Sequence, residues 1–270
     1  MGEIVYAAAL SHAPGITAFP NAPPQEKRER FFGAAALARL ALEDARPEAL
    51  LVIAPDHFTN FFVDNMPPFC IGLNKSYGGP AEEWLGLEYR VVPGAREIAA
   101  DILSTALDTG VDLAFSETLR LEHSVMVPLA LLTPKMNIPI VWIMLNCQVP
   151  PMPRLRRCWE LGRMLRSITD RRPERFGIVG TGGLSDHPGA PEMGTIDEDF
   201  DREFLGMIER SDRSALLSMR NEHIDDAGFG AWEIRQWLTV AGAVPERCGQ
   251  ILAYEAIHEW DTGCAIALFR

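Results

Sequence analysis

One segment decides the predicted fold: Ala54-Pro-Asp-His-Phe-Thr-Asn-Phe-Phe-Val-Asp-Asn-Met-Pro-Pro-Phe-Cys-Ile-Gly72. It follows an apolar run at residues 49–54, which is typical of a buried β-strand and which breaks at Pro55. Asp56 and His57 therefore lie where a strand passes into a loop, the place where open α/β sheets bind ligands. An imidazole there can bind a metal or transfer a proton, and a neighbouring carboxylate can orient it. For this segment alone, a histidine that only hydrogen-bonds its own loop is the simpler interpretation.

Strand and helix patterns alternate along the rest of the chain. Residues 3–10 predict a strand and residues 26–45 a helix, so that with residues 49–54 they form a right-handed βαβ unit. Residues 61–72 and 75–85 are interpreted as loops, the first as the wall of a pocket or a cover over the sheet. Further helices are expected at residues 93–109, 154–169, 197–208 and 232–242 and after His123, and further strands at 111–115, 138–145, 175–180 and 264–269, the last paired with 250–254. The pattern predicts one α/β domain over residues 1–270, with a central mixed, largely parallel sheet flanked by helices.

Composition excludes several classes of function. Asp and Glu outnumber Lys and Arg by 37 to 25, and a net charge of −12 argues against a nucleic-acid partner. No apolar run approaches the roughly 18 residues that a membrane span needs, and no basic region precedes the first apolar stretch, as a signal peptide would require. The 5 cysteines include no Cys-x-x-Cys pair. We therefore expect reduced thiols, a cytoplasmic protein and no membrane contact.

Four histidines share the context of His57. His12, His57, His123 and His187 all lie at predicted strand ends or helix starts. The ends of parallel strands converge on one edge of a sheet. Two imidazoles and one carboxylate with open positions suit non-haem Fe(II), and other imidazoles nearby could act as acids or bases. Unrelated hydrogen-bonding roles explain the spacing equally well.

Other motifs of catalysis are missing from the sequence. The Gly182-Gly183 pair is not part of a GxGxxG or a P-loop pattern, and the chain has no GxSxG elbow. His223 and His258 lie in no comparable context, and we interpret them as surface or structural residues.

The chain resembles the class III extradiol ring-cleavage dioxygenases nearly from end to end. This superfamily includes the catalytic (beta) subunit of protocatechuate 4,5-dioxygenase and 2,3-dihydroxyphenylpropionate 1,2-dioxygenase. The matching motifs, in order, are Leu10-Ser-His-Ala-Pro14, the segment from Ala54 to Gly72, Leu121-Glu-His-Ser-Val-Met-Val-Pro-Leu129, Gly180-Thr-Gly-Gly-Leu-Ser185 and Glu233-Ile-Arg-Gln-Trp237.

The resemblance implies specific roles. His12, His57 and Glu233 would bind Fe(II), and His123 would contact the substrate or oxygen. The implied reaction binds a catecholate and O₂ at the metal and cleaves the ring next to the diol, and a nearby base accepts a proton.

Two positions depart from the family pattern. The family commonly has Gly-Gly-Leu-Ser-His with an acid–base histidine, whereas this chain has Asp186 followed by His187. Either residue could take the role, or the substrate or reaction could differ. We expect His187 to reach the pocket and Asp186 to point away or orient it. The second departure is Trp232 before Glu233, where relatives often have histidine, and Trp232 either adds bulk near the metal or packs in the core.

The predicted function is an Fe(II)-dependent extradiol-type dioxygenase that acts with O₂ on a small catechol-like or aminophenol-like aromatic. Two alternatives stay open: a non-catalytic paralogous subunit of a dioxygenase complex, and a metal-dependent enzyme of other chemistry on the same scaffold. The presence of His12, His57 and Glu233 together argues against the first. We expect a homo-oligomer or a complex with a small paralogous or accessory subunit.

Overall fold

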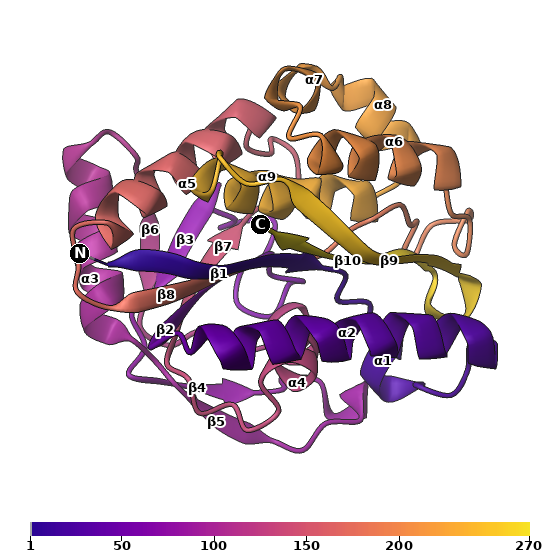
Figure 1. The fold of residues 1–270 in the computed structure, drawn as a ribbon, viewed down its shortest axis with the longest axis horizontal. Coiled ribbons are helices and arrows are strands. Elements are labelled where there is room, and N and C mark those ends of the chain that lie inside the picture. Colours follow the sequence, from indigo (N-terminus) through magenta and orange to yellow (C-terminus); the bar gives the residue numbers. More distant parts are fainter. Residues whose placement is uncertain (1) are drawn as a thin grey trace.

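The computed structural model describes residues 2–270 and has one large mixed sheet (Figure 1). Its strand order is β6-β3-β7-β2-β8-β1-β10-β9. The strands are β1 (Glu3–Leu10), β2 (Ala49–Ala54), β3 (Phe69–Gly72), β6 (Ala114–Ser116), β7 (Ile140–Leu145), β8 (Arg175–Thr181), β9 (Gly249–Ile257) and β10 (Thr262–Phe269). Neighbours from β7 to β1 are parallel, whereas β10 pairs antiparallel with both β1 and β9. The predicted α/β fold with a mixed, largely parallel sheet is confirmed.

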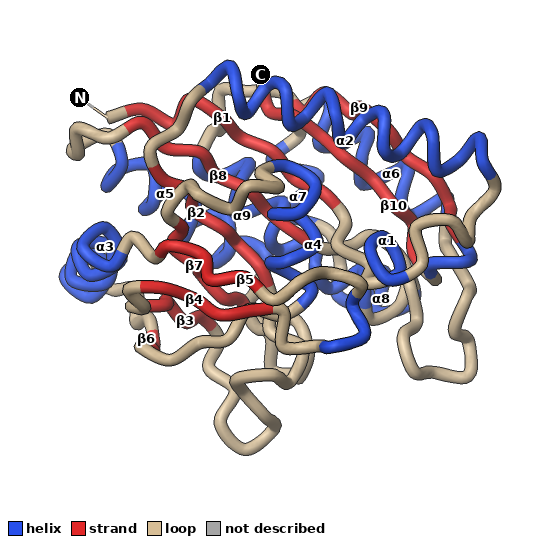
Figure 2. Tube along the Cα trace, turned by 90° about the horizontal axis from the view of Figure 1, so that it is seen from below, coloured by secondary structure: helices blue, strands red, loops and turns tan. Residues whose placement is uncertain are grey.

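Helices cover both faces of the sheet, because its central strands are apolar on both sides. Every residue of β2 and β7 is buried, as is usual for parallel strands inside a sheet. α2 (Gln25–Ala45) and α4 (His123–Leu132) pack on one face. α3 (Arg96–Asp108), α5 (Leu155–Thr169), α6 (Glu198–Glu209) and α9 (Ile234–Ala243) pack on the other. Figure 1 shows the two layers above and below the strands, and Figure 2 shows the strands side by side.

Shorter elements complete the fold. They are α1 (Gly15–Ala18), α7 (Arg213–Ser218), α8 (Asn221–Asp226), the 3₁₀ helices η1 (Glu83–Leu85), η2 (Gly230–Glu233) and η3 (His258–Trp260), and the hairpin of β4 (Ser76–Gly79) and β5 (Arg90–Pro93). Within residues 2–270, no helix has both the length and the apolar character to cross a bilayer.

The loop predictions for residues 61–72 and 75–85 are partly wrong. Residues 69–72 form β3, which pairs antiparallel with β7, and the second stretch contains β4 and η1. Four-residue strands beside prolines and glycines are too short to show a period of two, so their sequence looks like a loop. The strand expected at residues 111–115 is displaced to β6 for the same reason.

The parallel pairing places the ends of three central strands at one edge of the sheet. β8 lies between β1 and β2 and runs parallel to both. The segments that follow β1 and β2 carry His12 and His57, and the segment that follows β8 carries Asp186. The sheet therefore brings the loops after β1 and β2 together with the loop after β8, which lies more than a hundred residues further along the chain.

Two glycines allow α5 and α9 to pack closely. A Cβ atom on Gly162 of α5 would lie 2.0 Å from the carbonyl oxygen of Thr239 in α9. One on Gly242 of α9 would lie 2.3 Å from the carbonyl oxygen of Trp159. Because α9 begins directly after Glu233, this contact also fixes the position of that carboxylate.

We predict that Gly162→Ala destabilises the fold by about 1–3 kcal/mol, because the methyl group must push two helix backbones apart. Gly33→Ala is the matched control: Gly33 is exposed in α2, and a Cβ there meets no atom within 4 Å. The control should stabilise the protein by about 0.5–1 kcal/mol, since alanine is the better helix former. Urea unfolding of both variants measures the difference, and wild-type stability in Gly162→Ala would contradict the packing argument.

Candidate active site

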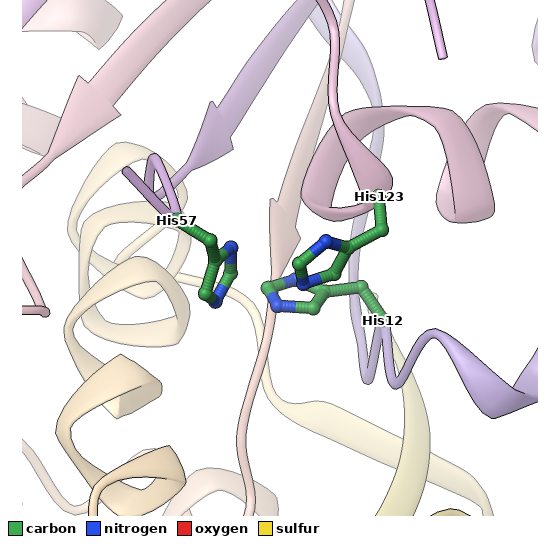
Figure 3. Close-up of side chains that lie close together, drawn as sticks. All are labelled: His12, His57 and His123. Atoms are coloured by element: carbon green, nitrogen blue, oxygen red, sulfur yellow. The ribbon is translucent and has the colours of Figure 1, made fainter. Parts of the chain in front are cut away.

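Three imidazoles face one another at the edge of the sheet where β1 and β2 end (Figure 3). His12 follows β1, His57 follows β2, and His123 is the first residue of α4. The ring centroids lie 5.2 Å apart for His12 and His57, 5.4 Å for His12 and His123, and 4.1 Å for His57 and His123. Segments from three parts of the chain thus form one cluster.

The carboxylate of Glu233 joins two of these rings. Its Oε1 lies 3.0 Å from His57 Nε2, and its Oε2 lies 3.3 Å from His12 Nε2. The backbone N–H of Gly183 donates to Oε2 at 2.9 Å. Burial alone would raise the pKa of Glu233, but the two imidazoles outweigh burial and hold this pKa below its usual range. Glu233 is therefore an ionised, buried carboxylate between His12 and His57.

The outer nitrogens of these two rings also have oxygen partners. His12 Nδ1 lies 3.1 Å from Thr181 Oγ1, at the end of β8. His57 Nδ1 lies 3.2 Å from Glu122 Oε2. Such partners fix the orientation of metal-binding imidazoles, since each ring has only one nitrogen left for the metal. In both rings the remaining nitrogen, Nε2, is the one that faces Glu233.

Glu122 connects His57 to His123. It is fully buried at the N-terminus of α4, where it accepts from the backbone N–H of Ser124 at 3.1 Å. His123 Nδ1 lies 2.8 Å from Glu122 Oε2 and 2.7 Å from Glu82 Oε1. Burial disfavours the charged form of each group, but mutual attraction raises the pKa values of His57 and His123 and lowers the pKa of Glu122. For His12 burial prevails and lowers the pKa.

The donor set of His12, His57 and Glu233 fits a divalent metal ion. Neighbouring ligands of an octahedral ion with bonds of about 2.1 Å lie about 3.0 Å apart. The observed separations of 3.0 and 3.3 Å between the imidazole nitrogens and the Glu233 oxygens match this spacing. Two imidazoles and one carboxylate are the ligands of non-haem iron sites.

A second, overlapping set of donors has a histidine in place of the carboxylate. One nitrogen each of His12, His57 and His123 lie within 4.8 Å of one another. We favour the set with Glu233, because its carboxylate contacts both His12 and His57 whereas His123 Nδ1 is held by two other carboxylates.

A cavity of about 300 Å³ opens onto the histidine cluster. Its volume is at the lower end of the range for small-molecule sites. The lining residues are His12, Ala13, Pro14, His57, Trp84, His123, Gln148, Gly183, Asp186, Pro188, Phe229, Gly230, Glu233 and Thr262.

Asp186, and not His187, faces this cavity. Asp186 Oδ2 accepts from the hydroxyl of Thr262 at 3.1 Å, while Oδ1 has no hydrogen-bond partner within residues 2–270. Burial, together with the charge of Glu233, raises the pKa of Asp186 to about 7. His187 is absent from the lining that the described residues form, and its Cε1 lies beside Gly228.

The expected orientation of this loop, with His187 in the pocket, is therefore wrong. The backbone explains the difference: Asp186 O accepts from the N–H of Gly230 at 3.3 Å. That hydrogen bond holds the loop against the start of η2. Because Gly230 has no side chain, there is space beside it for the Asp186 carboxylate.

Trp232 lies outside the cavity lining that residues 2–270 form. Its Nε1 donates to Asp225 Oδ1 at 2.8 Å, and its ring lies 4.9 Å from that of Phe229. Half-buried, it packs against the edge of the core, which is the second of the two expected positions. His223 and His258 also lie outside the lining and pair with Glu203 and the Gly194 carbonyl.

Several residues of the site were not predicted from the sequence. Glu122 carried a signal, because it directly precedes His123 at a helix start. Thr181 directly follows a predicted strand, but nothing marks its hydroxyl as a partner of His12. Glu82, Trp84 and Gln148 come from segments without a recognisable motif, so only the tertiary structure brings them to the cluster.

Known proteins are similar to this chain over nearly its whole length. The chain is 29% identical to a 2,3-dihydroxyphenylpropionate/2,3-dihydroxicinnamic acid 1,2-dioxygenase of Burkholderia vietnamiensis, over 96% of this chain and 95% of that protein. It is 33% identical to the protein of the same name from Photorhabdus laumondii, over 95% and 94% of the two chains.

A solved structure shares the fold. The crystal structure of an uncharacterized Escherichia coli K12 protein aligns with a TM-score of 0.61 at 13% identity, over 98% of this chain and 99% of that one. The sequence model of the family described as the catalytic LigB subunit of aromatic ring-opening dioxygenase matches residues 6–265. The chain belongs to this LigB family of extradiol ring-cleaving dioxygenases.

Proposed function

We propose that this protein is an Fe(II)-dependent extradiol dioxygenase that cleaves the ring of a small catechol-like or aminophenol-like aromatic with O₂. The observation that carries the proposal is the convergence of His12 Nε2 and His57 Nε2 on one buried carboxylate, Glu233, beside a cavity of ligand size. The related enzymes named for 2,3-dihydroxyphenylpropionate support an aromatic diol as the reacting group. We assign the whole of residues 1–270 to one catalytic domain, in a homo-oligomer or with a small accessory subunit.

His12, His57 and Glu233 would hold the iron. When bound, Fe(II) brings the diol and O₂ together and lowers the pKa of the bound hydroxyl. Thr181 and Glu122 keep the two imidazoles turned so that each Nε2 points to the metal position.

His123 is the group best placed to accept a proton from the substrate hydroxyl. Its ring lines the cavity, and Glu82 and Glu122 hold its Nδ1, so that Nε2 is the nitrogen free to meet the substrate. The two carboxylates stabilise the imidazolium that forms when the ring takes a proton, which is the property that a general base needs. Asp186 is the second proton-transfer group of the cavity and takes the position of the family's histidine.

We predict that Glu233→Ala loses both iron and turnover, because His12 and His57 alone offer only two ligands. Iron content by elemental analysis and O₂ uptake with a panel of catechols and aminophenols measure the two effects. Glu203→Ala is the matched control, since Glu203 only pairs with His223 at the surface. A Glu233→Ala protein that keeps stoichiometric iron and activity would refute the ligand set. Turnover without O₂ would indicate a metal-dependent enzyme of other chemistry. If the iron-loaded wild type takes up no O₂, the protein would instead be a non-catalytic subunit.

His123→Ala should keep its iron and lose turnover by about 10²–10⁴-fold, the usual contribution of a general acid or base. Single-turnover kinetics on the iron-loaded variant measure the loss, with His223→Ala as the control outside the cavity lining. If His123→Ala instead fails to retain iron, the three-histidine set is the metal site and the proton-transfer role is wrong.

Asp186→Asn should reduce turnover at unchanged iron content, because the amide cannot exchange a proton as the carboxylate does. His187→Ala should stay close to the wild type, since His187 lies outside the described cavity lining. The ratio of kcat values for the two variants is decisive. If the His187→Ala variant is inactive and the Asp186→Asn variant is active, His187 and not Asp186 is the acid–base residue.

A further inference from the structure

A buried carboxylate outside the cavity holds the loop that carries Asp186. Asp201 of α6 is fully buried and lies outside the cavity lining that residues 2–270 form. Its Oδ1 accepts from the backbone N–H of Ser185 at 2.8 Å, and its Oδ2 accepts from the Ser185 hydroxyl at 2.9 Å. One side chain therefore binds both donors of the residue that directly precedes Asp186.

The start of β10 holds the same stretch of loop from another side. The N–H of Leu184 donates to the carbonyl oxygen of Gly263 at 2.9 Å, and the N–H of Gly263 donates to the carbonyl oxygen of Ser185 at 3.1 Å. Gly263 also leaves the space that Asp201 occupies, because a Cβ atom there would lie 1.9 Å from Asp201 Oδ2. Ser185 is thus fixed through its backbone by β10 and through its N–H and hydroxyl by α6.

This double attachment determines which residue enters the cavity. Ser185 is fully buried, whereas Asp186, the next residue, lines the cavity. A shift of the loop by one residue, which would bring His187 to the place of Asp186, would remove both Ser185 donors from Asp201. A buried carboxylate that loses its donors is strongly disfavoured, so the contact with Asp201 opposes such a shift.

We propose that Asp201 is a positioning residue of this enzyme, which fixes Ser185 and thereby holds the Asp186 side chain at the cavity. The inference rests on the proposed role of Asp186 in proton transfer. Reacting groups must be placed closely for catalysis, whereas iron is held by other residues. Loss of the Asp201 contact should therefore lower kcat and leave iron content and substrate affinity unchanged.

Asp201→Asn tests the proposal, because an amide has one acceptor oxygen where the carboxylate has two. We expect kcat to fall about 10–100-fold, the scale of a small misplacement of a reacting group. O₂ uptake with the best-consumed compound of the catechol and aminophenol panel gives kcat, and anaerobic titration followed by tryptophan fluorescence gives affinity. The double variant with Asp186→Asn should be no slower than Asp186→Asn alone, since Asp201 then has no catalytic group left to position.

Two hydroxyl deletions separate positioning from stability. Ser185 and Tyr254 each donate a hydroxyl to Asp201 Oδ2, at 2.9 and 2.8 Å, but Tyr254 belongs to β9 and not to the loop. Ser185→Ala and Tyr254→Phe should both unfold at lower urea, because each removes a buried hydrogen bond. Only Ser185→Ala should lower kcat. Crystal structures should show residues 184–187 displaced in Asp201→Asn and in their wild-type place in Tyr254→Phe.

Three results would each overturn the inference: wild-type kcat in Asp201→Asn, a double variant whose loss is the product of the two single losses, or equal kcat in Ser185→Ala and Tyr254→Phe. Failure of the proposed function looks different. The iron-loaded wild type would then consume no O₂, or Asp186→Asn would keep the wild-type kcat. In that case the crystal structures decide, and an unmoved loop in Asp201→Asn overturns the positioning role.

Discussion

The pairing of one buried carboxylate with two imidazoles is the interaction on which the site depends. An ionised carboxylate that is removed from water costs several kcal/mol unless other groups compensate its charge. His12, His57 and the N–H of Gly183 together provide this compensation for Glu233. Because these groups follow β1, β2 and β8, a single side chain from the start of α9 ties together the ends of three strands. A metal ion in the same place would have its ligands already oriented.

The turn after β8 needs a backbone conformation and a close approach that only glycine adopts without strain. Gly182 has a φ of +116°, and a Cβ atom there would lie 2.3 Å from Glu233 Oε2. From the other side, Trp237 Nε1 donates to the Gly182 carbonyl at 2.8 Å, so α9 holds the turn as well as the carboxylate. The close packing of Gly162 in α5 against α9 continues this chain of contacts away from the site. The position of the carboxylate thus depends on backbone contacts that involve no catalytic side chain.

The sequence predicted what periodicity and strand ends can reveal. The run at residues 49–54 is a buried strand, the helix at residues 26–45 differs by one residue, and three of the four selected histidines meet at one edge. The orientation of Asp186 and His187 could not be predicted, because it depends on a hydrogen bond to Gly230, more than forty residues away. Glu82 was missed for a similar reason: it lies 41 residues before His123 in the chain, and only the tertiary structure brings the two side chains together.

The contact between Asp186 and Gly230 links two distant positions in evolution. A methyl group on Gly230 would lie 2.3 Å from Asp186 Oδ1, so the small residue and the carboxylate share one space. A histidine at position 186, as in the common family pattern, would need room for a ring in that same space. We therefore expect the two positions to co-vary among homologues, and a lineage that regained histidine there would pass through a poorly packed intermediate unless residues 228–230 changed with it.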